Sequence, residues 1–265
     1  VFEYNTHRNK VLRLHVSTFV SVCALFPNIT TLSMTDLRCK HLSLLVKYCP
    51  LVQSAVLTMS AEGGDFNAKS IDAVNRWKDI SELAIRNSGI KEDQLILLIR
   101  TCKTLTHICT IGSAAIESRL GDHIPKQYTG SKLVTLHTHC DSADTLIQIL
   151  SLCPYLHTLS LYSSNYGRRR GWGSDSDSDS GGESTRSRSS VLTIPFQIFT
   201  PECSVRHLKL KSYHDLEDAD ILKLQHTRLH SLTIRESDRI TNGGIQALLP
   251  TLHSLPPTCC RRPST

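Results

Sequence analysis

Apolar residues recur along the chain in a short phrase, L-x-x-L-x-L, in which apolar and polar positions alternate after a turn. Clear copies lie at residues 29–34, 156–161 and 229–234. Alternation over a few residues is typical of a half-buried strand, because successive side chains point to opposite faces of a sheet. Each phrase therefore predicts one short strand with one buried face.

A segment with helical spacing follows the predicted strands. After the strand at 83–85, a turn-forming Asn-Ser-Gly sequence leads into apolar residues at helical spacing over 95–99, and Cys102 closes the unit. The last clear unit has the same order, with Thr241 or Asn242 as the residue that caps the helix. We therefore expect units of one strand and one helix.

The first apolar residue of each phrase gives the period of these units. Successive gaps are 18, 23, 28, 25, 28, 23, 49, 24 and 23 residues, and most agree with the roughly 20–29 residues of a leucine-rich repeat. Since one unit cannot bury its own apolar face, stacked neighbours must complete the core. We predict an α/β leucine-rich-repeat solenoid, with a curved parallel sheet inside and helices outside. It would be a single domain over 1–265 with about nine to ten repeats. The first apolar residues are Val11, Ile29, Val52, Ile80, Leu105, Leu133, Leu156, Val205, Leu229 and Leu252.

Three of the ten cysteines occupy one place in three units, at the end of a helix just before the turn: Cys49, Cys102 and Cys153. Cysteine behaves there as a small buried hydrophobe, so a disulfide framework is disfavoured. We expect an intracellular protein, in the cytoplasm or nucleus. The chain starts without Met and ends in a sequence that resembles no repeat cap, so we interpret its ends as truncated.

These units resemble the cysteine-containing leucine-rich repeats of F-box/LRR proteins. The resemblance covers 11–255 apart from one insertion, and its strongest local matches are 85–105 and 234–252. It implies the substrate-binding part of an SCF ubiquitin ligase, a role in which the chain performs no chemistry. No F-box motif is visible, so an F-box that docks a Skp-type adaptor and cullin is expected upstream of Val1. The alternative is a free-standing repeat scaffold or regulator with no ubiquitin role.

The 49-residue gap contains one break in the array, at 164–190, which is rich in Ser, Asp, Gly and Arg. This composition predicts a disordered insertion, after which 191–199 restores a helix-like stretch that is broken by Pro195. Its acidic serine run suggests kinase acceptor sites, and phosphorylation would make it strongly negative. The alternative is a solvated linker without a role. The predicted acceptors are Ser174, Ser176, Ser178 and Ser180.

Strand residues that alternate with the buried leucines predict a concave surface. In the late half of the chain these residues are basic and polar, with Tyr162 as an aromatic anchor. We expect this surface to bind a protein substrate through an acidic or phosphorylated segment; the alternative is ordinary solvated surface. The predicted partner-binding residues are His137, His139, Tyr162, His207, Lys209, Lys211 and Arg235.

One run has metal-ligand character: His137, His139 and Asp141 resemble the start of the metal site of metallo-β-lactamase-like hydrolases. Ser142 stands where that motif needs a further His, and the repeat period contradicts that fold. A metal-dependent hydrolase is the least favoured function, and we assign no catalytic residue, metal or cofactor.

Two other classes of partner are disfavoured. The net charge of +6 is modest, and the Arg168–Arg170 run has acidic neighbours, so nucleic acid is not an expected partner. No apolar run approaches the roughly 18 residues that cross a membrane.

Overall fold

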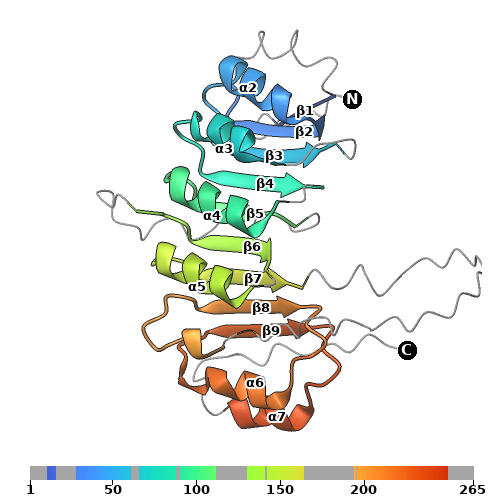
Figure 1. Ribbon diagram of the computed structural model, residues 1–265, viewed down its shortest axis with the longest axis vertical. Helices are drawn as coiled ribbons and strands as arrows, with labels where there is room; N and C mark the ends of the chain where they lie inside the picture. Colours follow the sequence, from blue (N-terminus) through green and yellow to red (C-terminus); the bar gives the residue numbers. More distant parts are fainter. Residues whose placement is uncertain are drawn as a thin grey trace, which may run out of the picture.

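The computed structural model describes the backbone of 11–15 and residues 28–60, 66–87, 90–111, 130–140, 142–163, 194 and 196–249. Nine strands form one parallel sheet, and their order across the sheet is their order along the chain (Figure 1). The strands are β1 (Val11–His15), β2 (Thr31–Leu37), β3 (Ser54–Met59), β4 (Glu82–Arg86), β5 (His107–Cys109), β6 (Thr135–His139), β7 (Thr158–Tyr162), β8 (His207–Lys211) and β9 (Ser231–Arg235).

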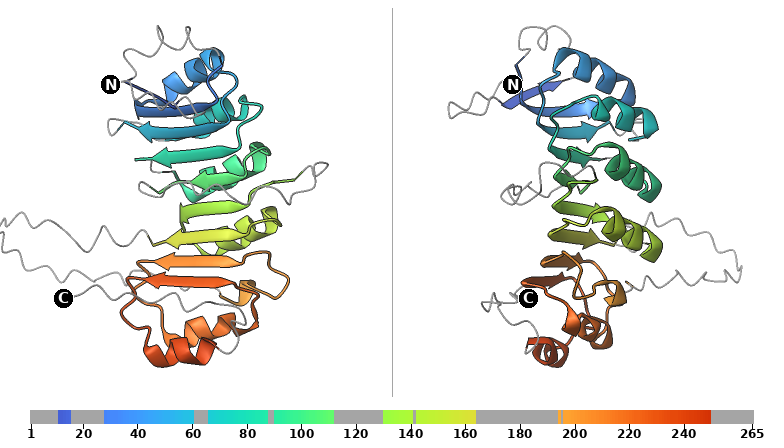
Figure 2. Two further views of the ribbon diagram at one scale, coloured as in Figure 1. Left: turned by 180° about the vertical axis from the view of Figure 1, so that it is seen from behind. Right: turned by 90° about the vertical axis from the view of Figure 1, so that its left-hand side faces the viewer.

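Most of the described helices lie on one side of this sheet, and the last two lie beyond β9 at its end (Figure 2). The described helices are α2 (Cys39–Tyr48), α3 (Ala68–Asn75), α4 (Glu92–Thr101), α5 (Ala143–Leu152), α6 (Asp218–Leu222) and α7 (Asn242–Leu248), with 3-10 turns η3 (Phe196–Ile198) and η4 (Lys223–His226). The strand order never reverses, so the sheet lacks the switch point at which doubly wound α/β domains bind ligands. The predicted class, α/β with one open parallel sheet alternating with helices, is confirmed. No described helix has both the length and the apolar composition needed to span a bilayer.

Neighbouring units are held in register by one backbone arrangement that recurs. The carbonyl of Thr30 accepts from the N–H groups of Gln53 and Ser54, at 2.7 and 3.0 Å. An equivalent pair of bonds links each strand from β3 to β9 to the unit before it. This arrangement confirms the spacing predicted from Ile29 to Leu229, including the 49-residue gap. The accepting residues are Thr30, Gln53, Ser81, Thr106, Val134, His157 and Arg206.

The first strand departs from the predicted register. Val11 pairs with Thr31 rather than taking the place of Ile29, so the predicted alignment of this weak phrase is wrong by two residues. A shift of two keeps every side chain on the same face, so alternation alone does not distinguish the two registers. The last predicted phrase, at Leu252, lies outside the described residues.

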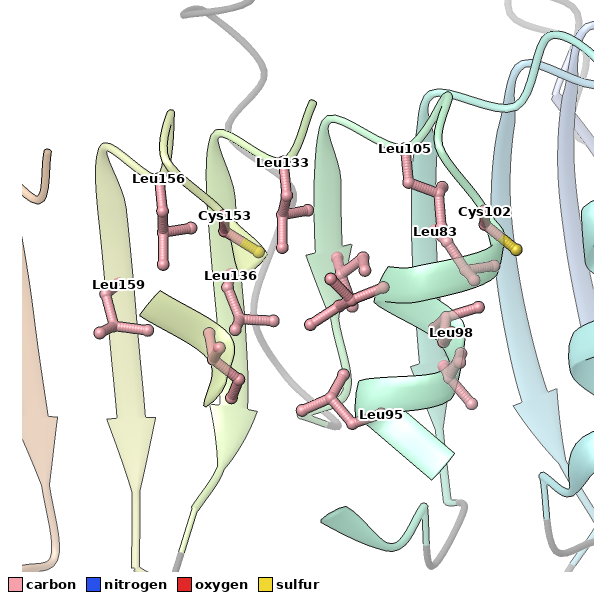
Figure 3. Packing of buried hydrophobic residues seen from close by; sticks show 14 of the residues in the cluster. Leu83, Leu95, Leu98, Cys102, Leu105, Leu133, Leu136, Cys153, Leu156 and Leu159 are labelled. Atoms are coloured by element: carbon pink, nitrogen blue, oxygen red, sulfur yellow. The ribbon is translucent and has the colours of Figure 1, made fainter. Parts of the chain in front are cut away.

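The strand leucines and the helix leucines form one layer between sheet and helices. Figure 3 shows Leu136 and Leu159 of the strands near the cysteines that end the helices, with Leu95 and Leu98 of α4 in the same layer. Leu136, Leu159 and Leu98 are fully buried. Even Ala55, which replaces a leucine at its phrase position, is fully buried, in register with Leu83 of the next strand. Burial of this stripe is the main force that stacks the units.

The prediction for the three repeated cysteines is confirmed. Cys49, Cys102 and Cys153 directly follow α2, α4 and α5, and each N–H donates to the carbonyl four residues earlier, at 2.8, 2.9 and 3.0 Å. Burial raises the pKa of the Cys102 and Cys153 thiols to about 11. Because the thiolate is the reactive form, these two thiols are poor nucleophiles and their role is packing.

Two aromatic side chains add bonds between units. The indole N–H of Trp77, itself 1% exposed, donates to the carbonyl of Cys49 at 2.8 Å. The hydroxyl of Tyr213, after β8, donates to the carbonyl of Cys140, after β6, at 3.0 Å. This bond therefore crosses the unit of β7. It joins a residue before the 49-residue gap to a residue after it.

The predicted insertion at 164–190 lies outside the described residues, as do its four serines. The helix-like stretch expected over 191–199 is, in its described part, the single 3-10 turn η3. The sheet nevertheless continues without a slip, because Leu159 of β7 pairs with Leu208 of β8.

Candidate functional site

The parallel register arranges the predicted partner-binding residues in three rows. These rows cross one side of the sheet. We call this side the helix-free face, because the structure describes no helix on it. All seven predicted residues lie on the rows, within β6 to β9. Row 1 is Thr135, Thr158, His207 and Ser231; row 2 is His137, Ser160, Lys209 and Thr233; row 3 is His139, Tyr162, Lys211 and Arg235.

Row 3 contains a cluster of aromatic and cationic groups. The Lys211 ammonium lies 5.9 Å from the centre of the Tyr162 ring, within the range of a cation–π contact. The His139 ring meets the same tyrosine edge-on, with ring centres 5.9 Å apart. Arg235 and His139 are exposed, and Tyr162 and Lys211 are half-buried. The end of row 3 thus offers an aromatic ring with the Lys211 cation beside it and the Arg235 cation on the next strand.

One acidic group borders this cluster. Glu236 lies 3.4 Å from the Lys211 ammonium and accepts from the Ser212 hydroxyl at 2.6 Å. Burial acts to raise the pKa of the Glu236 carboxyl, but the Ser212 bond and the Lys211 charge bring it below its usual value. Both charged side chains are 36% exposed, so the ion pair is weak and a ligand can compete for Lys211.

The early half of the helix-free face has different chemistry. Ala84 and Cys109 continue row 2 into β4 and β5, because Cys109 pairs with His137, and both are 1% exposed. Together with Ile111 they form an apolar cluster separate from the main core, with Val56 and Tyr162 packed against it. Tyr162 therefore touches both the apolar early half and the basic late half.

The structure also brings together three histidines that sequence reasoning did not group. Potential ligand atoms of His157, His207 and His230 all lie within 4.8 Å of one another. The ring centres are 5.1 Å apart for the 157–207 pair, 6.0 Å for 207–230 and 6.5 Å for 157–230. His207 Nδ1 lies 2.7 Å from the Ser231 hydroxyl. Burial, followed by the charge of His230, lowers the pKa of His207.

A sequence signal for this cluster exists. His157 and His230 occupy the same phrase position, directly after the first leucine, and His207 lies one position further along in the phrase between them. The prediction named only His207, as a partner-binding residue.

The other metal-binding alternative is not assembled among the described residues. His137 and His139 share one side of β6, but Asp141 lies outside the described residues. Within the described part of the chain, the histidine triad is the one group of three potential ligands found. Ser142, which replaces the further histidine of the hydrolase motif, instead caps α5 by accepting from the Thr145 N–H at 3.3 Å.

No protein-family model matches the chain, and no curated protein matches it. Register, surface chemistry and the sequence resemblance are therefore the grounds for a functional proposal.

Proposed function

We propose that the chain is a leucine-rich-repeat solenoid that recognises a partner protein on the late half of its helix-free face. Support for the repeat class comes from units of mostly 23 to 28 residues, a parallel sheet in sequential order and buried phrase leucines. Solenoids of this kind present extended surfaces that bind partners. The chain itself performs no chemistry in this proposal.

The observation that carries the proposal is the arrangement of cations in rows 2 and 3. Lys209 and Lys211 are alternate residues of β8, about 6.7 Å apart along the strand. Arg235 is the registered neighbour of Lys211 on β9, about 4.8 Å away across the sheet. An extended partner segment with acidic or phosphorylated residues at every second position has the same 6.7 Å repeat. Such a segment would form charge-assisted hydrogen bonds with these side chains.

The acidic partner can be tested with a fluorescent peptide that carries phosphoserine at alternate positions, and with its unphosphorylated form. Lys209→Glu with Lys211→Glu should weaken phosphopeptide binding at least tenfold by fluorescence anisotropy. The matched control is Lys69→Glu with Lys78→Glu, two exposed lysines in and just after α3, which changes the net charge equally. The control should stay within about twofold of the unmodified chain, since screening confines surface electrostatics to about 10 Å. Equal losses in both double variants, or no binding by the unmodified chain, would overturn the acidic-segment proposal.

For the biological role we propose substrate recruitment to an SCF ubiquitin ligase, in the cytoplasm or nucleus. The support is the resemblance of the repeats, with their helix-ending cysteines, to F-box/LRR proteins. The chain would hold the substrate while an F-box outside this sequence contacts a Skp-type adaptor and cullin.

The ligase role is tested by purifying the endogenous full-length protein under mild conditions and identifying its partners by mass spectrometry. We expect a Skp-type adaptor and a cullin to co-purify with the protein in stoichiometric amounts. Their absence, with the adaptor abundant in the same lysate, would overturn the ligase role and favour a free-standing repeat scaffold. That result would leave the peptide-binding proposal intact.

A further inference from the structure

Three histidines converge where the last three strands begin. His157 directly precedes β7, His207 is the first residue of β8, and His230 directly precedes β9. The backbone holds all three in place: the His207 N–H donates to the His157 carbonyl at 3.0 Å, and the His230 N–H donates to the Arg206 carbonyl at 2.7 Å. Their proximity is thus a consequence of the sheet register and does not depend on a flexible loop.

We infer that His157, His207 and His230 bind a transition-metal ion of the Zn²⁺ class. In a tetrahedral Zn²⁺ site with bonds of about 2.0–2.1 Å, ligand nitrogens lie about 3.4 Å apart. The potential ligand atoms here all lie within 4.8 Å of one another. Side-chain rotations that shorten each nitrogen–nitrogen separation by about 1.4 Å at most would therefore form the ligand set, with no change in the sheet.

A neighbouring hydroxyl supports one of the ligands. The Ser231 oxygen lies 2.7 Å from His207 Nδ1. When Nδ1 donates its proton to this oxygen, Nε2 keeps its lone pair and the ring orientation is fixed. Metal-binding histidines usually make such an outer hydrogen bond through their other ring nitrogen.

The ligand chemistry selects the class of ion. The set consists of three imidazoles without a carboxylate, so it suits Zn²⁺, Co²⁺, Ni²⁺ or Cu²⁺ better than Mg²⁺ or Ca²⁺, which prefer oxygen ligands. Arg206, the residue before His207, directs its guanidinium to the carbonyls of Cys203 and Val205, at 2.6 and 3.1 Å. His230 is exposed, so solvent can supply the fourth ligand.

The site has a structural consequence in the array. His157 lies at the start of β7, the strand at the 49-residue gap, and His207 and His230 lie at the starts of β8 and β9, which follow it. A bound ion would cross-link β7, β8 and β9 at this junction. Because it binds only the folded arrangement, it would raise the melting temperature of the chain.

The test is calorimetric titration of the full chain with Zn²⁺ after chelator treatment and dialysis. We expect one equivalent to bind, His230→Ala to abolish binding, and Ser231→Ala to weaken it at least about tenfold. Matched controls are His226→Ala and His139→Ala, two other exposed histidines, which should bind as the unmodified chain does. Since His230 is exposed, its removal should leave the circular dichroism spectrum and the metal-free melting temperature unchanged.

Co²⁺ identifies the ligand atoms, because the chain also has ten cysteines. The expected spectrum has the visible bands of tetrahedral Co²⁺ without the near-ultraviolet thiolate charge-transfer band. The inference is overturned if the unmodified chain binds no Zn²⁺, if the thiolate band appears, or if binding survives His230→Ala. Loss of binding in His139→Ala with retention in His230→Ala would assign the metal to β6 instead and would equally overturn it.

Discussion

The two halves of the helix-free face share one backbone arrangement and carry different side chains. Row 2 reads Ser33, Val56, Ala84 and Cys109 from β2 to β5, and His137, Ser160, Lys209 and Thr233 from β6 to β9. Row 2 is uncharged from β2 to β5 and contributes to a buried apolar cluster, whereas the late half of the face is basic with a histidine triad at its edge. The opposite face of the same strands is apolar in both halves. Packing against the helices therefore imposes the same apolar side chains on one face of each strand, and the other face differs between the two halves.

The largest expected effect tests whether the two halves are equally packed. Leu83 in β4 and Leu159 in β7 occupy the same phrase position, and both are fully buried. Leu83→Ala and Leu159→Ala should each lower the free energy of unfolding by about 2–5 kcal/mol, through lost burial and the cavity left behind. Urea denaturation followed by circular dichroism measures both. A loss under about 1 kcal/mol in one variant alone would contradict equal packing of the two halves.

A smaller effect concerns the early half. Trp77→Phe keeps an aromatic ring but removes the indole N–H that bonds the Cys49 carbonyl. The buried carbonyl loses its donor, so the free energy of unfolding should fall by about 1–3 kcal/mol in the same urea experiment. An unchanged denaturation midpoint would show that this bond does not stabilise the packing of neighbouring units.

The late half offers the corresponding test. Tyr213→Phe removes only the hydroxyl that bonds the Cys140 carbonyl across the unit of β7. We expect a loss of about 0.5–1.5 kcal/mol, less than for Trp77→Phe, because the ring volume is unchanged. If Tyr213→Phe costs more than Trp77→Phe, the junction beside the largest gap depends on this bond more than the early units depend on theirs.

The smallest effect is electrostatic and belongs to the basic half. Since the pKa of Glu236 in the folded chain is below its ordinary 4.5, its ionised form stabilises the fold above that pH. This contribution is lost as the pH falls through the lowered pKa. Because the Glu236–Lys211 ion pair is partly exposed, its contribution to the free energy of unfolding should be under about 1 kcal/mol. Urea denaturation should therefore separate Glu236→Gln from the unmodified chain at pH 7 and show no difference well below pH 4.5. A difference that persists in acid would mean that the ion pair with Lys211 is not its cause.

Much of the array could be predicted from local patterns. The strands from β2 to β9, their spacing and the three helix-ending cysteines follow from alternation, period and turn chemistry, which are properties of a few consecutive residues. The alignment of Val11 was wrong because a two-residue shift preserves the alternation. The stretch at 191–199, predicted as helix-like and broken by Pro195, forms the short 3-10 turn η3 in its described part. The hydrogen-bond roles of Trp77 and Tyr213 were not predicted, because they join residues 28 and 73 positions apart.

The sequence by itself determined which face of each strand is buried and that the seven predicted partner-binding residues lie on the other face, because burial follows the period of the chain. Only the tertiary structure decided which of those outward side chains meet. Strand register brings His157 next to His207 across 50 residues of chain and places Tyr162 between an apolar cluster and Lys211. Such encounters depend on backbone hydrogen bonds between units, so no single stretch of the sequence reveals them, and the shared phrase position of His157 and His230 becomes visible only when units are aligned.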